Sequence, residues 1–205
     1  MMSPIETINY FKSCEIVKPN KVILNEVFKD DSVCLEIEEK DRSAKLKKIT
    51  LTGFSEVFAF TQDSIPPATS YLFKKHLASA TSYLFKKHLA SATCDAIVFC
   101  VIENNPYILV LDLKSSLNGY KENKYKCKSA KNLISYLNDV LIEFTDSDLS
   151  EWQIVYCICH LSDPKRETEI SYDIKVSNNP NDPVYWKVEN AETIPIRKLL
   201  NIRLI

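Results

Sequence analysis

The residues best placed for chemistry are two aspartates and a lysine in the middle of the chain. Asp95 opens the apolar run DAIVFCVI, and Asp112 and Lys114 lie at the end of the run YILVLDLK. Residues two apart in a β-strand point to the same side, so Asp112 and Lys114 project together. Only a turn-like stretch at residues 103–106 separates the two runs. We therefore expect an antiparallel hairpin that brings Asp95 next to Asp112.

Two carboxylates on neighbouring strands make a donor set for a hard divalent cation. Mg²⁺ prefers oxygen ligands, and Mn²⁺ accepts the same ones. A lysine beside such a cation can orient a water molecule or stabilise negative charge that develops on a phosphate. The alternative is that Asp112 and Lys114 form an ordinary exposed ion pair on one face of a sheet.

This arrangement resembles the PD-(D/E)xK nuclease superfamily. The family pattern is a helix, a strand with an aspartate, a strand ending in (Asp/Glu)-x-Lys, a second helix and a further strand, and it maps here onto residues 68–160. The resemblance implies an α/β fold with a restriction-endonuclease-like core, in which helices flank a mixed central sheet. It also implies that Asp95 and Asp112 bind Mg²⁺ or Mn²⁺ and that Lys114 assists the attacking water. The implied activity is metal-dependent hydrolysis of DNA phosphodiester bonds.

The chain departs from the family pattern at several positions. Cys94 stands where the family has a proline, and Glu56 is a weak candidate for the upstream acid that many members carry. A lysine early in the second helix would have to be Lys126, Lys128 or Lys131. Two rival functions stay open. One is a module that keeps the nuclease fold without cleavage and binds nucleic acid or a protein partner, as immunity proteins do. The other is an interaction protein whose basic middle docks an acidic partner.

The middle of the chain is basic although the net charge is only −1. Residues 74–131 hold ten lysines against four acids. Such a segment favours a polyanionic partner, and a solvated lysine-rich face is the plainer alternative. We expect DNA as the partner, with RNA as the second choice, no membrane, and an oligomeric state that the sequence leaves open, a homodimer included. The candidate contacts to nucleic acid are Lys74, Lys75, Lys86, Lys87, Lys126, Lys128 and Lys131.

Composition excludes some other classes of protein. With only 2 glycines the chain has no P-loop and no Rossmann fingerprint. The 7 cysteines follow no signal-peptide pattern, and no apolar stretch is long enough to span a membrane, so we expect a cytoplasmic protein with cysteines in its core. Cys157, Cys159 and His160 lack two further ligands at zinc-site spacing, and core cysteines are the expected reading.

The pattern of apolar residues predicts the elements that must position this site. Strands are expected at residues 21–27, 32–38, 45–52, 56–61, 95–102, 107–114, 153–160 and 184–188, and helices at 4–13, 126–144 and 197–202. We expect a β-rich region at residues 1–67 that packs on an α/β core at residues 68–205, together forming one compact domain.

A duplication stands directly in front of the candidate site. The segment ATSYLFKKHLAS occupies residues 68–79 and again residues 80–91. Each copy has a helical pattern, but a shift of 12 residues turns a helix by about 120°. The apolar faces of the two copies would therefore not align in one continuous helix. We expect a tolerated duplication that does not carry the chemistry.

Overall fold

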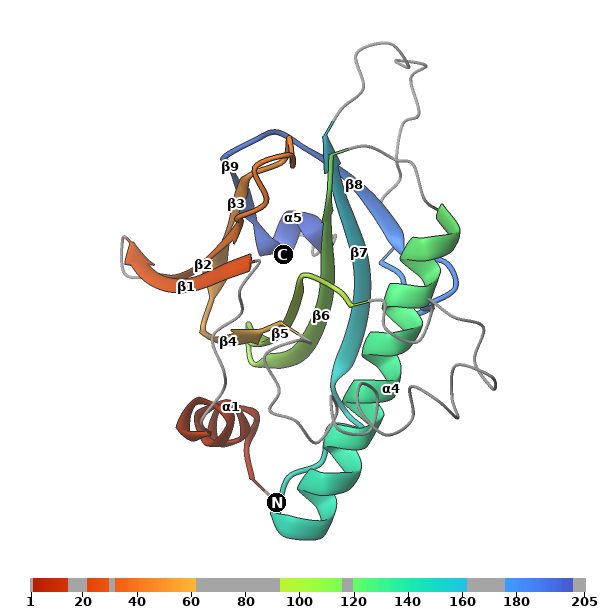
Figure 1. The fold of residues 1–205 in the computed structure, drawn as a ribbon. Coiled ribbons are helices and arrows are strands. Elements are labelled where there is room, and N and C mark those ends of the chain that lie inside the picture. Colours follow the sequence, from red (N-terminus) through yellow and green to blue (C-terminus); the bar gives the residue numbers. More distant parts are fainter. Residues whose placement is uncertain are drawn as a thin grey trace.

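The computed structural model describes residues 2–14, 22–29, 32–61, 93–115, 120–161 and 176–200. Within them the chain has an α/β fold with two mixed β-sheets and few helices (Figure 1). The duplicated segment at residues 68–91, which was predicted to be helical, lies outside the described residues.

A five-stranded sheet with the order β4-β5-β6-β7-β8 forms the centre of the molecule. Its strands are β4 (Glu56–Phe60), β5 (Ala96–Ile102), β6 (Asn105–Lys114), β7 (Gln153–Leu161) and β8 (Val184–Val188). Neighbours from β4 to β6 are antiparallel, whereas those from β6 to β8 are parallel. Every residue of β5 is buried, which fits a strand covered on both faces and explains its unbroken apolar run.

The predicted hairpin between β5 and β6 forms with a tighter turn than expected. Only Glu103 and Asn104 connect the strands, and both have positive φ, 50° and 65°. Two-residue hairpin loops favour this backbone because it matches the twist of the strands. Asn105 and Pro106 therefore belong to β6 rather than to the turn.

The helix α4 (Tyr120–Phe144) carries the chain from β6 to β7. A parallel pair of strands requires such a crossover. Residues at three- and four-residue spacing bury its inner face, among them Cys127, Ala130 and Ile134. The helix begins six residues before the predicted start at residue 126, because its first two turns are mostly polar and show no apolar periodicity.

A second, four-stranded sheet combines both ends of the chain. It has the order β1-β2-β3-β9, with β1 (Val22–Lys29), β2 (Ser32–Glu39), β3 (Lys48–Phe54) and β9 (Glu192–Pro195). β9 was not predicted, and it pairs in parallel with β3. The short helix α5 (Ile196–Leu199) follows directly. Because β4 joins the central sheet and β9 joins the second sheet, strands from both sides of the expected boundary at residues 67 and 68 share each sheet.

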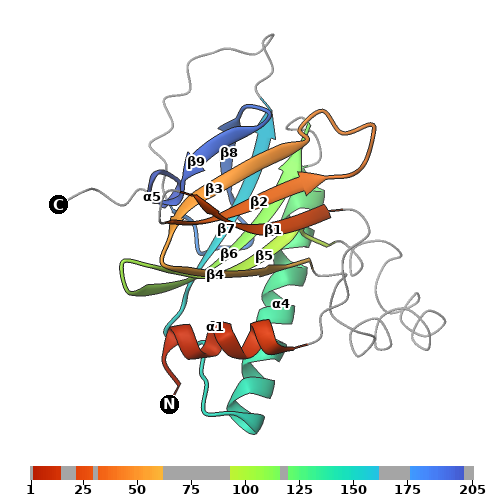
Figure 2. The ribbon, with the colours of Figure 1, turned by 90° about the vertical axis from the view of Figure 1, so that its left-hand side faces the viewer.

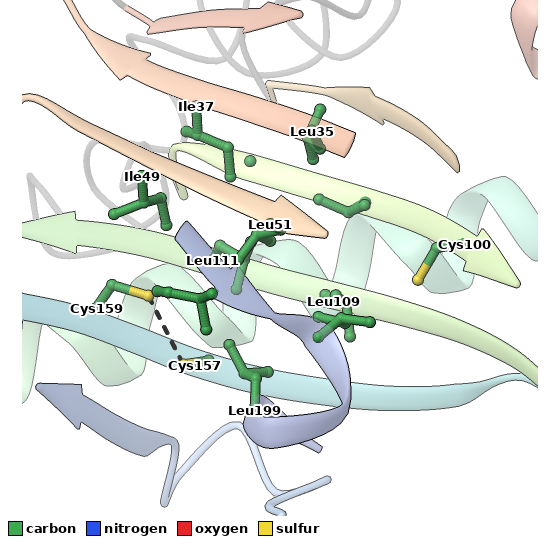
Figure 3. Close-up of a cluster of buried hydrophobic side chains, with 14 of the residues drawn as sticks. Leu35, Ile37, Ile49, Leu51, Cys100, Leu109, Leu111, Cys157, Cys159 and Leu199 are labelled. Carbon is green, nitrogen blue, oxygen red and sulfur yellow. Dashed lines mark hydrogen bonds between the residues drawn. The ribbon is translucent and has the colours of Figure 1, made fainter. Parts of the chain in front are cut away.

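The fold has three layers (Figure 2). An intersheet core lies between the two sheets and contains side chains such as Leu35, Leu51 and Leu109 (Figure 3). A helix-side core lies on the other face of the central sheet, where α1 (Pro4–Ser13) and α4 pack, and it contains Phe11, Phe99 and Ile134, among others. In the part of the chain that the structure describes, no helix has the length and apolar character needed to cross a membrane.

Candidate active site

Asp112 lies on the helix-covered face of β6 and is fully buried. Its neighbours Leu111 and Leu113 point into the intersheet core, whereas Ile108 and Val110 on its own side belong to the helix-side core. The exposed fraction of Asp112 is 0%. The alternative of an exposed ion pair is therefore wrong, because one partner has no access to solvent.

Two lysines hold the two oxygens of the Asp112 carboxylate. Lys126 Nζ donates a hydrogen bond of 2.8 Å to Oδ1. Lys114 Nζ lies 3.1 Å from Oδ2 and forms an ion pair without hydrogen-bond geometry, so Oδ2 accepts no hydrogen bond from the described residues. As period-two geometry predicted, Lys114 lies beside Asp112 on one face of the strand.

Lys126 comes from the helix and not from the sheet. It lies on the inner side of α4, one residue before the buried Cys127, and its side chain is only 14% exposed. Sequence reasoning named Lys126 among three candidates for a helix lysine at the site, and geometry selects it. Lys128 instead lies over the ring of Tyr125, 5.7 Å from its centroid, and Lys131 is exposed.

Asp95 immediately precedes β5, and its side chain continues the hydrogen bonding between β5 and β6. Its Oδ2 accepts a hydrogen bond of 2.7 Å from the backbone N–H of Leu113. The aspartate is thereby fixed next to the segment Asp112-Leu113-Lys114, although it lies just outside the strand that it was expected to open. Oδ1 of Asp95 makes no hydrogen bond within the described residues. We call Asp95, Asp112, Lys114 and Lys126 the aspartate–lysine cluster.

The charges of the cluster act strongly on one another. Burial and the negative charge of Asp112 raise the pKa of Asp95 to about 7, against the smaller opposing effects of Lys126 and the Leu113 N–H. Burial alone would lower the pKa of Lys126, but the negative charges of Asp112 and Asp95 outweigh it and raise that pKa. The lysine therefore stays charged, while Asp95 is poised between its two protonation states near neutral pH.

Two cysteine thiols border the cluster without taking part in it. A hydrogen bond with Cys127, burial and the charge of Asp112 raise the pKa of Cys94 well above its ordinary value. A thiol with a raised pKa is a poor nucleophile, since the thiolate is the reactive form. Cys94 is therefore a core residue.

The donor chemistry of the cluster fits a hard cation. Among the described residues Oδ1 of Asp95 makes no hydrogen bond and Oδ2 of Asp112 has only the ion pair with Lys114, so these two carboxylate oxygens are candidate ligands for Mg²⁺ or Mn²⁺. Glu39, at the end of β2, is a further acid whose charge also raises the pKa of Asp95. Among the described residues no group of three or more His, Cys, Asp or Glu side chains is arranged as a ready metal site. A cation would therefore have to complete its shell with water or substrate oxygens.

The remaining predicted residues lie elsewhere. Glu56, the weak upstream acid, lies opposite Val101 at the far end of β5 and pairs with Lys12. Lys74, Lys75, Lys86 and Lys87 lie outside the described residues. Cys157 and Cys159 are buried free cysteines of the intersheet core, as expected.

Two further buried polar side chains lie near the cluster: Asn123, which sequence reasoning missed, and His160, which it considered only as a possible zinc ligand. Asn123 is fully buried on α4, and neither nitrogen nor oxygen of its amide has a hydrogen-bond partner among the described residues. His160, on β7, is 4% exposed, and in the part of the chain that the structure describes its Nε2 has no partner either. For Asn123 a signal existed: residues 123, 127, 130 and 134 follow helical spacing, which places an amide on an otherwise apolar face. No protein-family model, curated protein or solved structure matches this chain.

Proposed function

We propose that the aspartate–lysine cluster hydrolyses phosphodiester bonds of nucleic acid, with DNA as the expected substrate and Mg²⁺ or Mn²⁺ as the cofactor. The observation that carries the proposal is the fully buried Asp112, with Lys114 from its own strand and Lys126 from α4 on its two oxygens. The order of Asp95, the Asp-x-Lys strand, a helix and a parallel strand also supports the resemblance to PD-(D/E)xK nucleases.

A purely structural role explains the cluster poorly. Removing charges from water is costly, and a buried ion pair can often be replaced by apolar side chains of similar volume without loss of stability. The cluster is surrounded by apolar residues of the helix-side core that could have continued through it. Perturbed titrating groups that gather in this way are typical of functional sites.

Each side chain has a role that its position supports. Oδ1 of Asp95 and Oδ2 of Asp112 would hold the cation, and a bound Mg²⁺ or Mn²⁺ would lower the pKa of a coordinated water and offset charge on the phosphate. Lys114, the less buried lysine, is placed to orient the attacking water. Lys126 is placed to stabilise the negative charge that develops on the phosphate oxygens. The excess of lysines in residues 74–131 favours a polyanionic substrate.

The test is cleavage of supercoiled plasmid DNA with Mg²⁺ or Mn²⁺ by the wild type and Asp112→Asn. We expect the cleavage rate of the variant to fall at least about 100-fold, because the substitution replaces a carboxylate that binds the cation with a neutral amide. Asp139→Asn, the same substitution at an exposed position of α4, is the control and should cleave like the wild type. Equal rates for wild type and Asp112→Asn would rule out cleavage at this cluster.

A nuclease-fold module that binds without cleaving is the second candidate. It is favoured by one observation: Asp95 and Asp112 are balanced by Lys114 and Lys126, so the cluster needs no cation for neutrality. Calorimetric titration with Mn²⁺ separates the two candidates. Cation binding that Asp112→Asn abolishes supports the enzyme, whereas DNA retention without cation binding or cleavage supports the module.

A further inference from the structure

A second set of polar side chains lies one step further along the same strands. In the strand register Lys114 of β6 is paired with His160 of β7, and His160 with Lys187 of β8. All three alternate with residues of the intersheet core, such as Leu113, Cys159 and Trp186, so they lie on the face that α4 covers. We call Lys114, His160 and Lys187 the strand-end row.

The imidazole of His160 is fixed on one side and open on the other. Its Nδ1 lies 3.0 Å from the carbonyl oxygen of Leu161. A carbonyl oxygen only accepts hydrogen bonds, so Nδ1 carries the proton of this bond. Nε2 is buried and has no partner within the described residues.

The geometry of α4 places Asn123 near the same row. Because α4 returns antiparallel to β6, moving from Lys126 towards the start of the helix leads towards the ends of the strands. Three helical residues advance about 4.5 Å, and the two strand residues from Asp112 to Lys114 advance about 6.6 Å. Since Lys126 contacts Asp112, Asn123 is placed near the level of Lys114 and His160.

Two unpartnered buried polar groups at one place call for an explanation. Each is destabilising when no hydrogen bond compensates for the lost contact with water. Lys114 is the register neighbour of His160, and Lys126 lies about one turn from Asn123 on α4, so two positive charges lie close by. The two polar groups also lie by the start of a 25-residue helix and at the carboxyl ends of parallel strands, where α/β proteins bind ligands and helix dipoles favour anions.

We propose that Asn123 and the strand-end row bind a phosphate group of a nucleotide, next to the phosphate that reacts at the aspartate–lysine cluster. The amide of Asn123 would donate from Nδ2 to a phosphate oxygen, and its Oδ1 would accept from an amino group of the same nucleotide's base. Both orphaned atoms would then be satisfied by one nucleotide. Asn123, His160 and Lys187 supply no carboxylate for a metal cation, whereas the nearby lysine ammonium groups attract a phosphate.

His160 would bind the phosphate as an imidazolium. Burial lowers the pKa of His160 in the free protein, the hydrogen bond to the Leu161 carbonyl opposes this in part, and the positive charge of Lys187 adds a smaller lowering, so the imidazole is neutral near pH 7. The charged groups around it are Lys114 on β6, Lys187 on β8, and the pair Lys126–Asp112 from α4 and β6. A phosphate anion adds the missing negative charge, and binding should therefore take up a proton at His160.

The first experiment is a titration with inorganic phosphate in the absence of divalent cations, followed by calorimetry and by the imidazole NMR signal of His160. We expect saturable binding with a shift of that signal, and binding at least about tenfold weaker in His160→Gln. Asn123→Leu should also weaken binding at least about tenfold, yet raise the melting temperature, because an unsatisfied amide is replaced by an apolar side chain.

Asn138→Leu is the matched control on the same helix. Its Oδ1 accepts a hydrogen bond of 2.6 Å from the Leu149 N–H, so this variant should lower the melting temperature and leave phosphate binding unchanged. Phosphate binding by Asn123→Leu and His160→Gln at wild-type strength, or no binding of phosphate to the wild type, would overturn the proposal.

The source of the phosphate is decided with short oligonucleotides that carry a 5′-phosphate, a 3′-phosphate or no terminal phosphate. Preference for one phosphorylated end assigns a terminal phosphate, and equal binding of all three, weakened by Asn123→Leu, assigns a backbone phosphate. This inference rests on the proposed function for the substrate class, but experiments can disprove either one without the other. Phosphate binding without any cleavage would remove the proposed function alone, and cleavage with unaltered phosphate binding in both variants would remove this inference alone.

Discussion

At the scale of single residues, Asp112 shows how a strand and a helix share one carboxylate. The strand supplies Asp112 and Lys114 at period-two spacing, which could be predicted from the sequence. The helix supplies Lys126, which could not be selected from Lys126, Lys128 and Lys131, because the rotation of α4 on the sheet depends on how both surfaces pack. Contacts between distant segments, and not periodicity, decide which helix lysine meets the aspartate.

The two lysines should differ in their contribution to stability. Lys126→Met is expected to lower the free energy of unfolding by about 3 kcal/mol, because it removes the more buried, hydrogen-bonded partner of Asp112. Lys114→Met should cost less, since Lys114 is more exposed and its contact is looser. Urea denaturation followed by circular dichroism measures both. The double variant Asp112→Asn, Lys126→Met should recover part of the loss, and a larger cost for Lys114→Met would contradict this ranking.

Asp95 should make stability depend on pH. Its pKa rises from 3.8 to about 7 on folding, through burial and the charge of Asp112, so between these values the folded state binds more protons than the unfolded state. This contribution is fully present below about pH 4 and is lost as pH rises through about 7.

The measurement is the free energy of unfolding of wild type and Asp95→Asn at several pH values. The difference, wild type minus variant, should fall by a few kcal/mol between about pH 4 and about pH 7. The lowered pKa of His160 acts equally in both proteins and cancels. Asp139→Asn serves as the exposed control, and a difference that stays flat or rises with pH would show that Asp95 ionises normally.

At the scale of elements, long apolar runs were predictable and short pairings were not. β5 and β7 are read directly from DAIVFCVI and QIVYCICH because buried strands need continuous apolar side chains. β9 has four residues, two of them glutamate and proline, and it exists only because β3 offers a parallel edge. The predicted strand from residue 45 begins at Lys48, since the preceding residues form the loop from β2.

The turn between β5 and β6 predicts a stabilising substitution. Glu103 has a φ of 50°, a region that asparagine tolerates much better than glutamate. Glu103→Asn should therefore raise the free energy of unfolding by about 0.5–1 kcal/mol, despite losing the exposed ion pair with Arg197. Glu103→Gln is the matched control, because it loses the ion pair without relieving the backbone. Thermal melts compare the three proteins, and equal melting temperatures for the two variants would count against backbone strain.

At the scale of the whole molecule, each sheet contains one strand that comes from the other half of the sequence. β3 receives β9 from residues 192–195, and β5 receives β4 from residues 56–60. No local pattern encodes such pairings. Composition suggested a boundary between two regions at residues 67 and 68, but it could not show that each sheet contains strands from both regions. The central sheet nevertheless brings Asp95, Asp112 and α4 together through consecutive elements, which is why the candidate site was easier to predict than the architecture around it.

The last prediction concerns the duplicated segment in the connection between β4 and β5. Phe60 at the end of β4 is paired with Ile97 near the start of β5, so the chain leaves and re-enters the sheet at adjacent positions. The entropy of closing such a connection changes slowly with its length, and removing residues 80–91 should change it by less than about 0.5 kcal/mol. The junction is also preserved, because Ser79 would precede Ala92 as Ser91 does now. We therefore expect the deletion variant to melt within a few degrees of the parent and to keep its Mn²⁺ binding.

A variant of parental length with residues 80–91 replaced by a glycine–serine linker controls for length, and a melting temperature many degrees lower in both variants would show that the second copy packs on the fold.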